Sequence, residues 1–344
     1  MIAMRESVSR SRARDMLATA FGPVIMSALS DPCVIEIMLN PDGHLWIERQ
    51  GAQQTDCGGL MAAEHAERAI RLVATLGGRE LTPTSPIVSA ELPMGGERFE
   101  GVMPPVAPGP CFSIRRPAQR IILLDDYVTA GAMSAHYAYA LRKAVRERAN
   151  VLVVGGAGSG KTTLANALLA EIARTGDRLV ILEDTRELVS AAPNLVRLRT
   201  QPGSVTLAEL VRCTLRLRPD RIIIGEVRGA EALDMLKAWN TGHPGGIATL
   251  HANSAFGGLS RLEQLIGEGA VRVPHDLIAE TIDCVVYISR RAGAHRVETV
   301  ALMNGLGCDG YDLRPVQPSL ELVMPGLPFT EPLHSTAPER THPK

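Results

Sequence analysis

The C-terminal part of the chain contains apolar runs of five or six residues that alternate with segments of helical periodicity. The runs are VLVVG (151–155), RLVILE (178–183), RIIIGE (221–226), GIATLH (246–251) and CVVYIS (284–289). Strands that are apolar on both faces are typical of a mainly parallel sheet covered by helices on either side. With a helix over 134–148, the pattern predicts an α/β domain at residues 134–304.

The N-terminal part has a different pattern, in which apolar and polar positions alternate. It predicts a short helix, a hairpin, an amphipathic helix and three further strands, at 16–29, 34–49, 62–76, 87–92, 98–103 and 111–116. Alternation is expected of strands with one buried and one solvated face. We therefore expect a small α+β domain at 16–120, followed by a linker at 121–133.

The two ends of the chain lack such patterns. Residues 1–15 are rich in Arg and Ser and are expected to form a disordered basic arm. No apolar segment with a cleavage site follows them, so a secretory signal is not expected. Residues 305–344 contain many prolines and little periodicity, which predicts an extended or disordered tail.

Composition narrows the class of protein. The chain is 45% hydrophobic and 21% charged, with no apolar run near the length of a membrane span, so any membrane contact is expected to be peripheral. A net charge of -1 and 3% aromatic residues argue against a broad nucleic-acid-binding surface. The six cysteines include no CxxC pair, so neither a zinc site nor a disulfide framework is indicated.

The segment VLVVGGAGSGKTTLANALLAEI carries the strongest chemical signal. It fits the phosphate-loop pattern, with a strand before it and a helix after it. Glycines let backbone N–H groups wrap phosphates at a helix N-terminus, while Lys161 reaches the β- and γ-phosphates and the Thr162 hydroxyl ligates Mg²⁺. The predicted nucleotide-binding residues are Gly155, Gly156, Ala157, Gly158, Ser159, Gly160, Lys161, Thr162 and Thr163.

Lysine usage favours ATP as the nucleotide. Only four of the 36 basic residues are lysines, so a lysine between Gly160 and Thr162 is improbable by chance. None of the four follows an asparagine, so the NKxD pattern that reads guanine is absent. ATP with Mg²⁺ is the expected ligand.

Hydrolysis also requires carboxylates that orient the attacking water and assist the metal. Glu226 ends the RIIIGE run, at the strand edge where ligands sit in open α/β sheets, and is expected to orient the water. Gly225 stands where a usual hhhhDE strand would supply an aspartate to Mg²⁺, so another carboxylate must assist. Glu183 is the first candidate and Asp184 the second, with a solvated charge cluster as the alternative.

Arginines form a second group of charges near these motifs. Arg115 and Arg116 lie close to the domain boundary, where a guanidinium reaching the γ-phosphate would couple hydrolysis to domain movement. On an edge strand the same residues could simply be solvated. Four more arginines flank the Glu226 strand, and some are candidates to pair with Glu183 or Asp184. These four are Arg216, Arg218, Arg221 and Arg228.

Four ordered motifs together resemble one family. GGAGSGKTT, ILEDTREL, TLRLRPDRIIIGEVRG and TGHPGGIATLHANS are similar, in order and spacing, to the secretion and pilus traffic ATPases of bacterial type II and type IV systems. The resemblance is strongest to the TrbB-type conjugative transfer ATPases. It extends to EIMLNPDGHLWIER, VSAELPMGGERFEGVMPPV and FSIRRP, and covers residues 16–303.

The resemblance implies an N-terminal α+β domain and a RecA-like domain, assembled as a homohexamer on the cytoplasmic face of the inner membrane beside type IV secretion components. It implies that ATP lies between the domains, with Arg115 and Arg116 approaching the phosphates. It also makes Glu226 the catalytic carboxylate and TGHPGGIATLHANS a His box. We expect His251 to donate a hydrogen bond to the γ-phosphate that ADP cannot accept, and His243 to be structural or intersubunit.

The function implied by the resemblance is an ATP-hydrolysing motor that powers substrate transfer or pilus assembly in a conjugative type IV secretion system. One alternative is a RecA-like nucleic-acid motor, whose ATPase would be stimulated by DNA with a steep salt dependence. Another is an ATP-dependent assembly scaffold with little turnover, against which the retained Glu226 and Glu183 argue. No sequence-specific nucleic-acid binding is expected.

Overall fold

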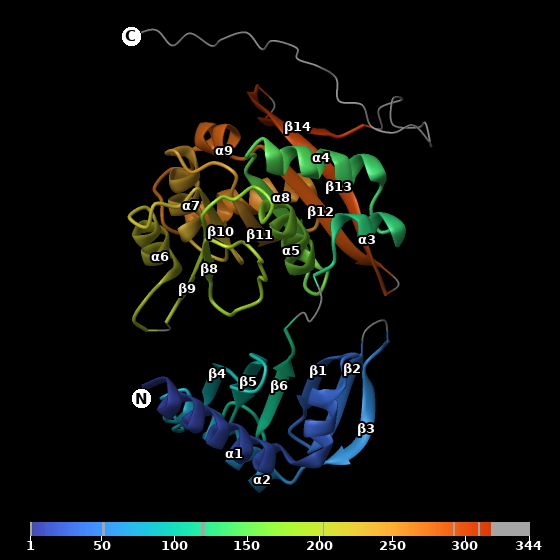
Figure 1. Ribbon diagram of the computed structural model, residues 1–344, viewed down its shortest axis with the longest axis vertical. Coiled ribbons are helices and arrows are strands. Elements are labelled where there is room, and N and C mark those ends of the chain that lie inside the picture. Colours follow the sequence, from blue (N-terminus) through green and yellow to red (C-terminus); the bar gives the residue numbers. More distant parts are fainter. Residues whose placement is uncertain are drawn as a thin grey trace.

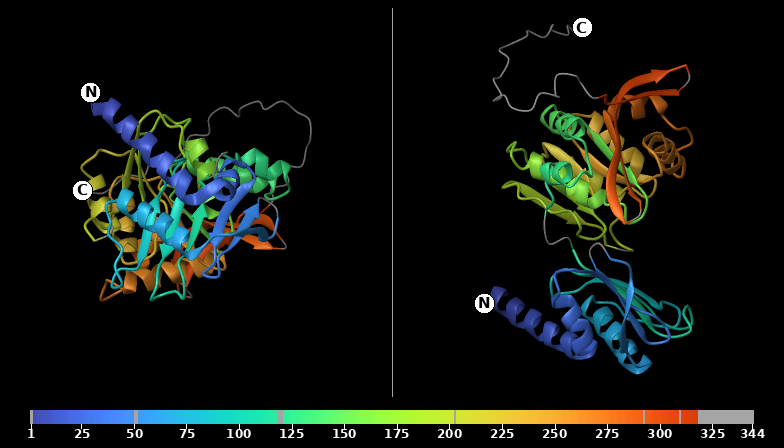
Figure 2. Two further views of the ribbon diagram at one scale, coloured as in Figure 1. Left: turned by 90° about the horizontal axis from the view of Figure 1, so that it is seen from below. Right: turned by 90° about the vertical axis from the view of Figure 1, so that its right-hand side faces the viewer.

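The computed structural model has two domains stacked along its long axis (Figures 1 and 2). The first is built on a six-stranded antiparallel sheet and the second on an eight-stranded, mostly parallel sheet. This confirms the predicted order of a small α+β domain followed by an α/β domain. The described residues are 2–49, 52–117, 121–201, 203–291, 293–308 and 310–317, with side chains described from Ser11 onward.

The N-terminal sheet has the strand order β3-β2-β1-β6-β5-β4, with helices α1 and α2 packed on one face (Figure 1). Its buried face is filled by aliphatic side chains and by Phe21, Phe99 and Phe112, whose ring centroids lie 5.4 to 6.1 Å apart. The opposite face carries both charged and polar residues, such as Glu36, Ser113 and Arg115, and apolar ones, such as Met38 and Trp46. The elements are α1 (Ile2–Ser30), β1 (Val34–Leu39), β2 (His44–Arg49), β3 (Thr55–Leu60), α2 (Ala63–Leu76), β4 (Ile87–Glu91), β5 (Arg98–Val102) and β6 (Cys111–Arg115).

Helix α1 is longer than the sequence pattern predicts. A disordered arm was expected before a short helix, whereas α1 begins at Ile2 and is broken at Gly22, where φ is 75°. The Arg14 guanidinium donates hydrogen bonds to the carbonyl oxygens of Pro93 and Met94, at 2.7 and 3.0 Å. These contacts link the end of the expected arm to the β4–β5 connection, a tertiary interaction that local periodicity does not reveal.

The C-terminal sheet has the strand order β14-β13-β12-β7-β11-β10-β8-β9. All five predicted apolar runs are strands, and β12, β7, β11, β10, β8 and β9 run parallel. The core on one face includes α3, α4 and α5, and the core on the other includes α6, α7, α8 and α9. The elements are α3 (Leu124–Thr129), α4 (Ala135–Arg146), β7 (Val151–Gly155), α5 (Lys161–Ile172), β8 (Leu179–Glu183), β9 (Leu195–Arg199), α6 (Leu207–Thr214), β10 (Arg221–Ile224), α7 (Glu231–Asn240), β11 (Ile247–His251), α8 (Ala255–Gly267), α9 (His275–Thr281), β12 (Cys284–Arg291), β13 (Ala294–Gly307) and β14 (Gly310–Pro315).

Two segments expected to be irregular contain regular structure. The linker at 121–133 includes α3, which packs into the core of the α/β domain. The tail was expected to begin at residue 305, but β13 continues past this point and pairs with β14 as far as Pro315. The rest of the tail, residues 318–344, lies outside the described residues. No helix in the described part of the chain is long and apolar enough to span a membrane.

Buried polar contacts hold the amino ends of the central strands. Arg221, considered above as a partner of the site carboxylates, lies at the opposite end of the sheet and is 1% exposed. Its Nε donates a hydrogen bond to Asp177 at 2.6 Å. The Asn150 side-chain oxygen accepts hydrogen bonds from the backbone N–H groups of Gly245 and Gly246, both at 2.9 Å. The amino ends of the strands therefore have a structural role. The candidate site lies at the opposite edge of the sheet, at the carboxyl ends of the strands.

Candidate nucleotide-binding site

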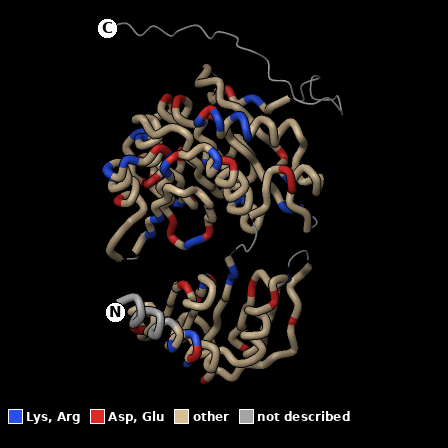
Figure 3. The backbone as a smooth tube through the Cα atoms, viewed as in Figure 1, with Lys and Arg blue, Asp and Glu red and all other residues tan. Residues whose placement is uncertain are grey.

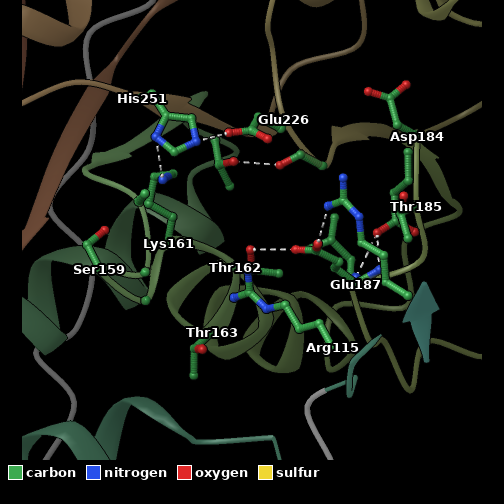
Figure 4. Close-up of a pocket in the computed structure, with 18 of the residues that line it drawn as sticks. Arg115, Ser159, Lys161, Thr162, Thr163, Asp184, Thr185, Glu187, Glu226 and His251 are labelled. Atoms are coloured by element: carbon green, nitrogen blue, oxygen red, sulfur yellow. Dashed lines mark hydrogen bonds and ion pairs between the residues drawn. The ribbon is translucent and has the colours of Figure 1, made fainter. Parts of the chain in front are cut away.

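The carboxyl ends of β7, β11, β10 and β8 lie side by side and bring the sequence motifs to one edge of the sheet. His251 lies opposite Gly155 in the parallel register. Glu226 follows β10, which lies between the strands that end at His251 and Glu183. A cleft at this edge is lined by the phosphate loop, by the ends of these strands and by Arg98 and Arg115 of the N-terminal domain (Figure 4).

The phosphate loop depends on its glycines. A Cβ atom at Gly155 would lie 2.4 Å from both the carbonyl oxygen of Ile288 and the Ser159 hydroxyl. Gly158 and Gly160 have φ values of 65° and 95°, a left-handed conformation that favours glycine. The buried Ser159 hydroxyl has no hydrogen-bond partner among the described residues. A tight loop that leaves a buried polar atom unsatisfied fits the binding of a polar ligand such as a phosphate.

The side chain of Lys161, the first residue of α5, is held against the phosphate loop. Its Nζ donates hydrogen bonds to the carbonyl oxygens of Gly155 and Gly156, at 3.1 and 2.9 Å. Burial lowers the pKa of Lys161, and the Glu226 carboxylate opposes this shift. Nζ also lies 3.3 Å from Nδ1 of His251. The ammonium group of Lys161 is therefore next to His251, the residue expected to donate a hydrogen bond to the γ-phosphate.

His251 bridges Lys161 and Glu226 (Figure 4). Its Nε2 lies 2.6 Å from the Glu226 carboxylate, while Nδ1 faces the ammonium group. Burial and the Lys161 charge lower the pKa of His251, which favours the neutral ring. The neutral tautomer that satisfies both contacts accepts at Nδ1 and donates from Nε2. Thr249, two residues earlier, donates to the carbonyl oxygen of Gly225 at 2.6 Å and links β11 to the Glu226 segment.

Arg228 holds the other side of the Glu226 carboxylate. Its Nε donates to Glu226 at 2.7 Å, and Nη2 contacts the same oxygen. Burial by itself lowers the pKa of Arg228, but the hydrogen bond to Glu226 and the charge of that carboxylate outweigh burial, so the pKa is raised. Nη1 of Arg228 lies 3.9 Å from Asp184. Of the four arginines considered as partners of the site carboxylates, Arg228 is thus the one that the structure brings to the cleft.

Glu183, the first carboxylate considered to assist the metal, lines the cleft together with Asp184. It is 3% exposed, and its Oε1 accepts the backbone N–H groups of Glu187 and Leu188, at 2.8 and 2.7 Å. Burial raises the pKa of this carboxyl group. Glu183 therefore shapes the loop after β8, because both hydrogen bonds are made to that loop. The Glu187 carboxylate instead accepts a hydrogen bond from the Thr162 hydroxyl at 3.1 Å, so Glu187 lies beside the predicted Mg²⁺ ligand.

The two N-terminal arginines also separate. Arg115 lines the cleft, whereas Arg116 donates hydrogen bonds to the carbonyl oxygens of Asp31 and Val34 within its own domain. Arg98, which the sequence analysis did not single out, lines the cleft instead, with Nη1 3.5 Å from the Glu187 carboxylate. Arg98 is directly opposite Arg115 in the sheet register. The position of Arg98 in the cleft follows from this strand pairing, and no local sequence motif indicates it.

Two further histidines have structural contacts. Nδ1 of His243 lies 3.0 Å from the carbonyl oxygen of Pro219. This contact links the segment before β11 to the turn before β10. His295 of β13 has Nδ1 2.9 Å from the carbonyl oxygen of Ser159 in the phosphate loop. Since a carbonyl oxygen only accepts, the Nδ1 of His295 carries the proton. His295 was not predicted, because its strand is far from the loop in sequence.

Residues 21–310 match the model of a protein family described as type II/IV secretion system protein. The chain belongs to this family. It is 49% identical over 310 residues to conjugal transfer protein TrbB of Rhizobium radiobacter, which covers 90% of this chain and 95% of that relative. It is also 36% identical over 303 residues to type IV secretion system protein PtlH of Bordetella pertussis, with 77% and 88% covered.

The solved structure of the pilus retraction motor PilT with bound ADP shares the fold of this type II/IV secretion family member, with a TM-score of 0.59 at 18% identity, covering 87% of this chain and 83% of that one. The resemblance drawn from the four motifs is therefore confirmed, together with the RecA-like fold of the second domain. As a member of this family with a complete phosphate loop, the chain is an ATPase.

Proposed function

We propose that this ATPase is the motor of a conjugative type IV secretion system, and that ATP hydrolysis powers substrate transfer or pilus assembly. The observation that carries the proposal is the His251 bridge between Lys161 and Glu226, in a cleft lined by both domains. A residue that contacts both the phosphate-binding lysine and the candidate catalytic carboxylate is suited to link the state of the nucleotide to the geometry of the cleft. The identity to a conjugal transfer protein over nearly the whole chain supports the conjugative role.

The backbone N–H groups of the phosphate loop and the Lys161 side chain bind the phosphates. The Thr162 hydroxyl and, through water, the Glu187 carboxylate would hold Mg²⁺, because hard oxygen donors and substrate phosphates are the usual ligands of this ion. When bound, Mg²⁺ neutralises charge on the phosphate oxygens. This assignment keeps Thr162 from the sequence analysis and adds Glu187 to the candidates Glu183 and Asp184, which also line the cleft.

Glu226 orients the attacking water, and the hydrogen bond from Arg228 holds that carboxylate in place. The Nε2–H of His251 has two possible acceptors, Glu226 or a γ-phosphate oxygen. ATP therefore draws the histidine away from Glu226 and leaves the carboxylate to bind water, while ADP offers no such acceptor. Arg115 and Arg98, from the N-terminal domain, neutralise charge on the transferred phosphate and tie hydrolysis to the position of that domain.

We also propose that the chain assembles as a homohexamer on the cytoplasmic face of the inner membrane, in contact with other type IV secretion components. Two relatives, named as a conjugal transfer protein and a type IV secretion system protein, support this assignment. The cleft supports it as well, since arginines supplied by one domain to the phosphates on another make turnover depend on how the domains are arranged.

The test measures ATP hydrolysis and solution mass together, with and without ATP and Mg²⁺, for the unmodified chain and Glu226→Gln. We expect rings of about six subunits for both. The variant should bind ATP but hydrolyse it at least ~100-fold more slowly, because the water loses its orienting carboxylate. Glu64→Gln, an exposed carboxylate of α2, is the matched control and should hydrolyse ATP at the unmodified rate.

Other outcomes separate the alternatives. If both chains remain monomeric and bind ATP with equal, negligible turnover, the assembly scaffold is correct and the motor is not. If single-stranded DNA stimulates hydrolysis with a steep dependence on salt, the nucleic-acid motor is correct.

A further inference from the structure

A single line of charged residues crosses the N-terminal sheet. The strand register pairs Glu48 with Glu36, Glu36 with Arg115, Arg115 with Arg98, and Arg98 with Glu91. Residues directly opposite one another in a sheet lie on the same face, so these five side chains form one row, which we call the charged row. Its order across β2, β1, β6, β5 and β4 is acid, acid, base, base, acid.

The outer acids of the charged row pair with arginines of the ATPase domain. Glu48 lies 3.4 Å from Arg290, and Glu91 lies 2.7 Å from Arg199. Arg290 and Arg199 are at the carboxyl ends of β12 and β9, the same sheet edge that carries the nucleotide site. In Figure 3, charged positions at the upper end of the N-terminal domain face charged positions at the lower end of the ATPase domain.

The inner arginines of the charged row face the cleft. Arg115 and Arg98 both line it, and Arg98 approaches Glu187 beside the phosphate loop. The two outer contacts are separated by four strand spacings, roughly 19 Å. Two contacts so far apart, on either side of the inner arginines, fix the rotation of one domain relative to the other, which a single contact would not.

We infer that Glu48–Arg290 and Glu91–Arg199 are positioning pairs, which dock the N-terminal domain on the ATPase domain so that Arg115 and Arg98 meet the phosphates. None of these four residues reaches the phosphate loop itself; they act through the inner arginines. The pairs are partly exposed, with Arg199 49% and Arg290 36% accessible, so each contributes modestly and the docking is reversible. Reversible docking is what a domain that opens and closes during turnover requires.

The inference rests on the proposed role of the N-terminal arginines, and charge reversal tests it. Arg199→Glu places two carboxylates opposite each other and should lower kcat at least ~10-fold, because even a displacement of about 1 Å in a catalytic group can cost ~100-fold. ADP affinity should change less than about threefold, since the phosphate loop is untouched. The double variant Glu91→Arg with Arg199→Glu restores an ion pair of opposite polarity and should recover kcat to within about threefold.

Arg212→Glu is the matched control, because Arg212 pairs with Asp234 at 3.2 Å on α6 and α7. It breaks a comparable exposed ion pair outside the cleft and should leave kcat unchanged. The inference is overturned if Arg199→Glu hydrolyses ATP like Arg212→Glu, or if the swapped pair is no faster than the single variant. Arg115→Ala distinguishes failure of the proposed role of Arg115 from failure of the positioning pairs. If it keeps full turnover, the proposed role of the arginines fails; if it loses turnover while Arg199→Glu does not, only the positioning pairs fail.

Discussion

At the scale of single residues, the site consists of side chains whose contacts come from distant strands. His251, Glu226 and Lys161 were predicted from motifs because each follows a strand end that the sequence marks clearly. The contact of Glu187 with the Thr162 hydroxyl was not predicted, since it depends on how the loop after β8 folds back. His295 was missed for a similar reason: its contact with Ser159 joins residues 136 positions apart.

His295 provides a prediction at this scale, because one hydrogen bond from its Nδ1 holds the backbone of the phosphate loop. His295→Leu removes the donor and should weaken ADP binding about three- to tenfold, the range expected for one neutral hydrogen bond. His295→Asn places an amide N–H near the position of Nδ1 and should restore most of the affinity. Calorimetric titration with ADP measures both. Equal affinities for the Leu and Asn variants would show that the hydrogen bond does not matter.

At the scale of elements, sequence patterns predict buried strands well and edge strands poorly. The five apolar runs are strands because both of their faces are covered, so every position carries the signal. Strand β3, with the sequence TDCGGL, is an exposed edge with almost no apolar signal. Glycines occur at the end of β13 (Gly305 and Gly307) and at the start of β14 (Gly310), and they weaken the strand pattern after residue 304. Helix α1 was underestimated because its first half is polar in sequence, and because the contact of Arg14 with the β4–β5 connection cannot be read from local periodicity.

The amino ends of the central strands give a prediction about stability. Arg221→Ala leaves the buried Asp177 carboxylate with Arg148, a far more exposed partner, and should lower the free energy of unfolding by about 3 kcal/mol. Arg314→Ala, which breaks an exposed pair with Asp312, should cost no more than about 1 kcal/mol. Urea unfolding followed by circular dichroism measures both. Similar losses for the two variants would contradict the importance of burial.

The pH dependence of this effect follows from Asp177. Burial raises the pKa of Asp177, but hydrogen bonds from Thr175 and Arg221 outweigh it, so the native pKa lies below the ordinary 3.8. The contribution to stability is therefore complete above pH 3.8 and is lost as pH falls through the native pKa. The gap in unfolding free energy between the unmodified chain and Arg221→Ala should narrow below about pH 4.

At the scale of the whole molecule, residues of both domains line the site. Arg115 and Arg116 were expected to approach the phosphates; Arg115 lines the cleft, whereas Arg116 contacts the backbone of its own domain. The positioning pairs could not be predicted from the sequence, because a pair such as Glu48 with Arg290 joins positions 242 residues apart and depends on the register of two separate sheets. Sequence patterns thus predicted the two domains and most of the motifs, but not how the domains dock.

Docking through partly exposed ion pairs predicts a dependence of turnover on salt. Screening lengths fall from about 10 Å at 0.1 M to about 3 Å at 1 M salt, so kcat at saturating ATP should decrease severalfold over this range. A variant with all four positioning residues replaced by Gln should start with a low kcat and change little with salt. Steady-state hydrolysis at fixed Mg²⁺ measures this. An equal salt dependence in both chains would mean that the ion pairs do not control docking.

Strand β6 carries Arg115 one residue after Ile114, which is buried against the helices of its domain. Successive side chains of a strand point to opposite faces, so inserting or deleting one residue in β6 would turn Arg115 into the core and expose Ile114 to the cleft. A change of two residues would keep each type of side chain on its own face. The length of this strand can therefore vary in even steps while the protein retains both its core and its nucleotide site, whereas a single extra residue would have to be accommodated in a β-bulge, as at the register shift between Val34 and Glu36 of β1.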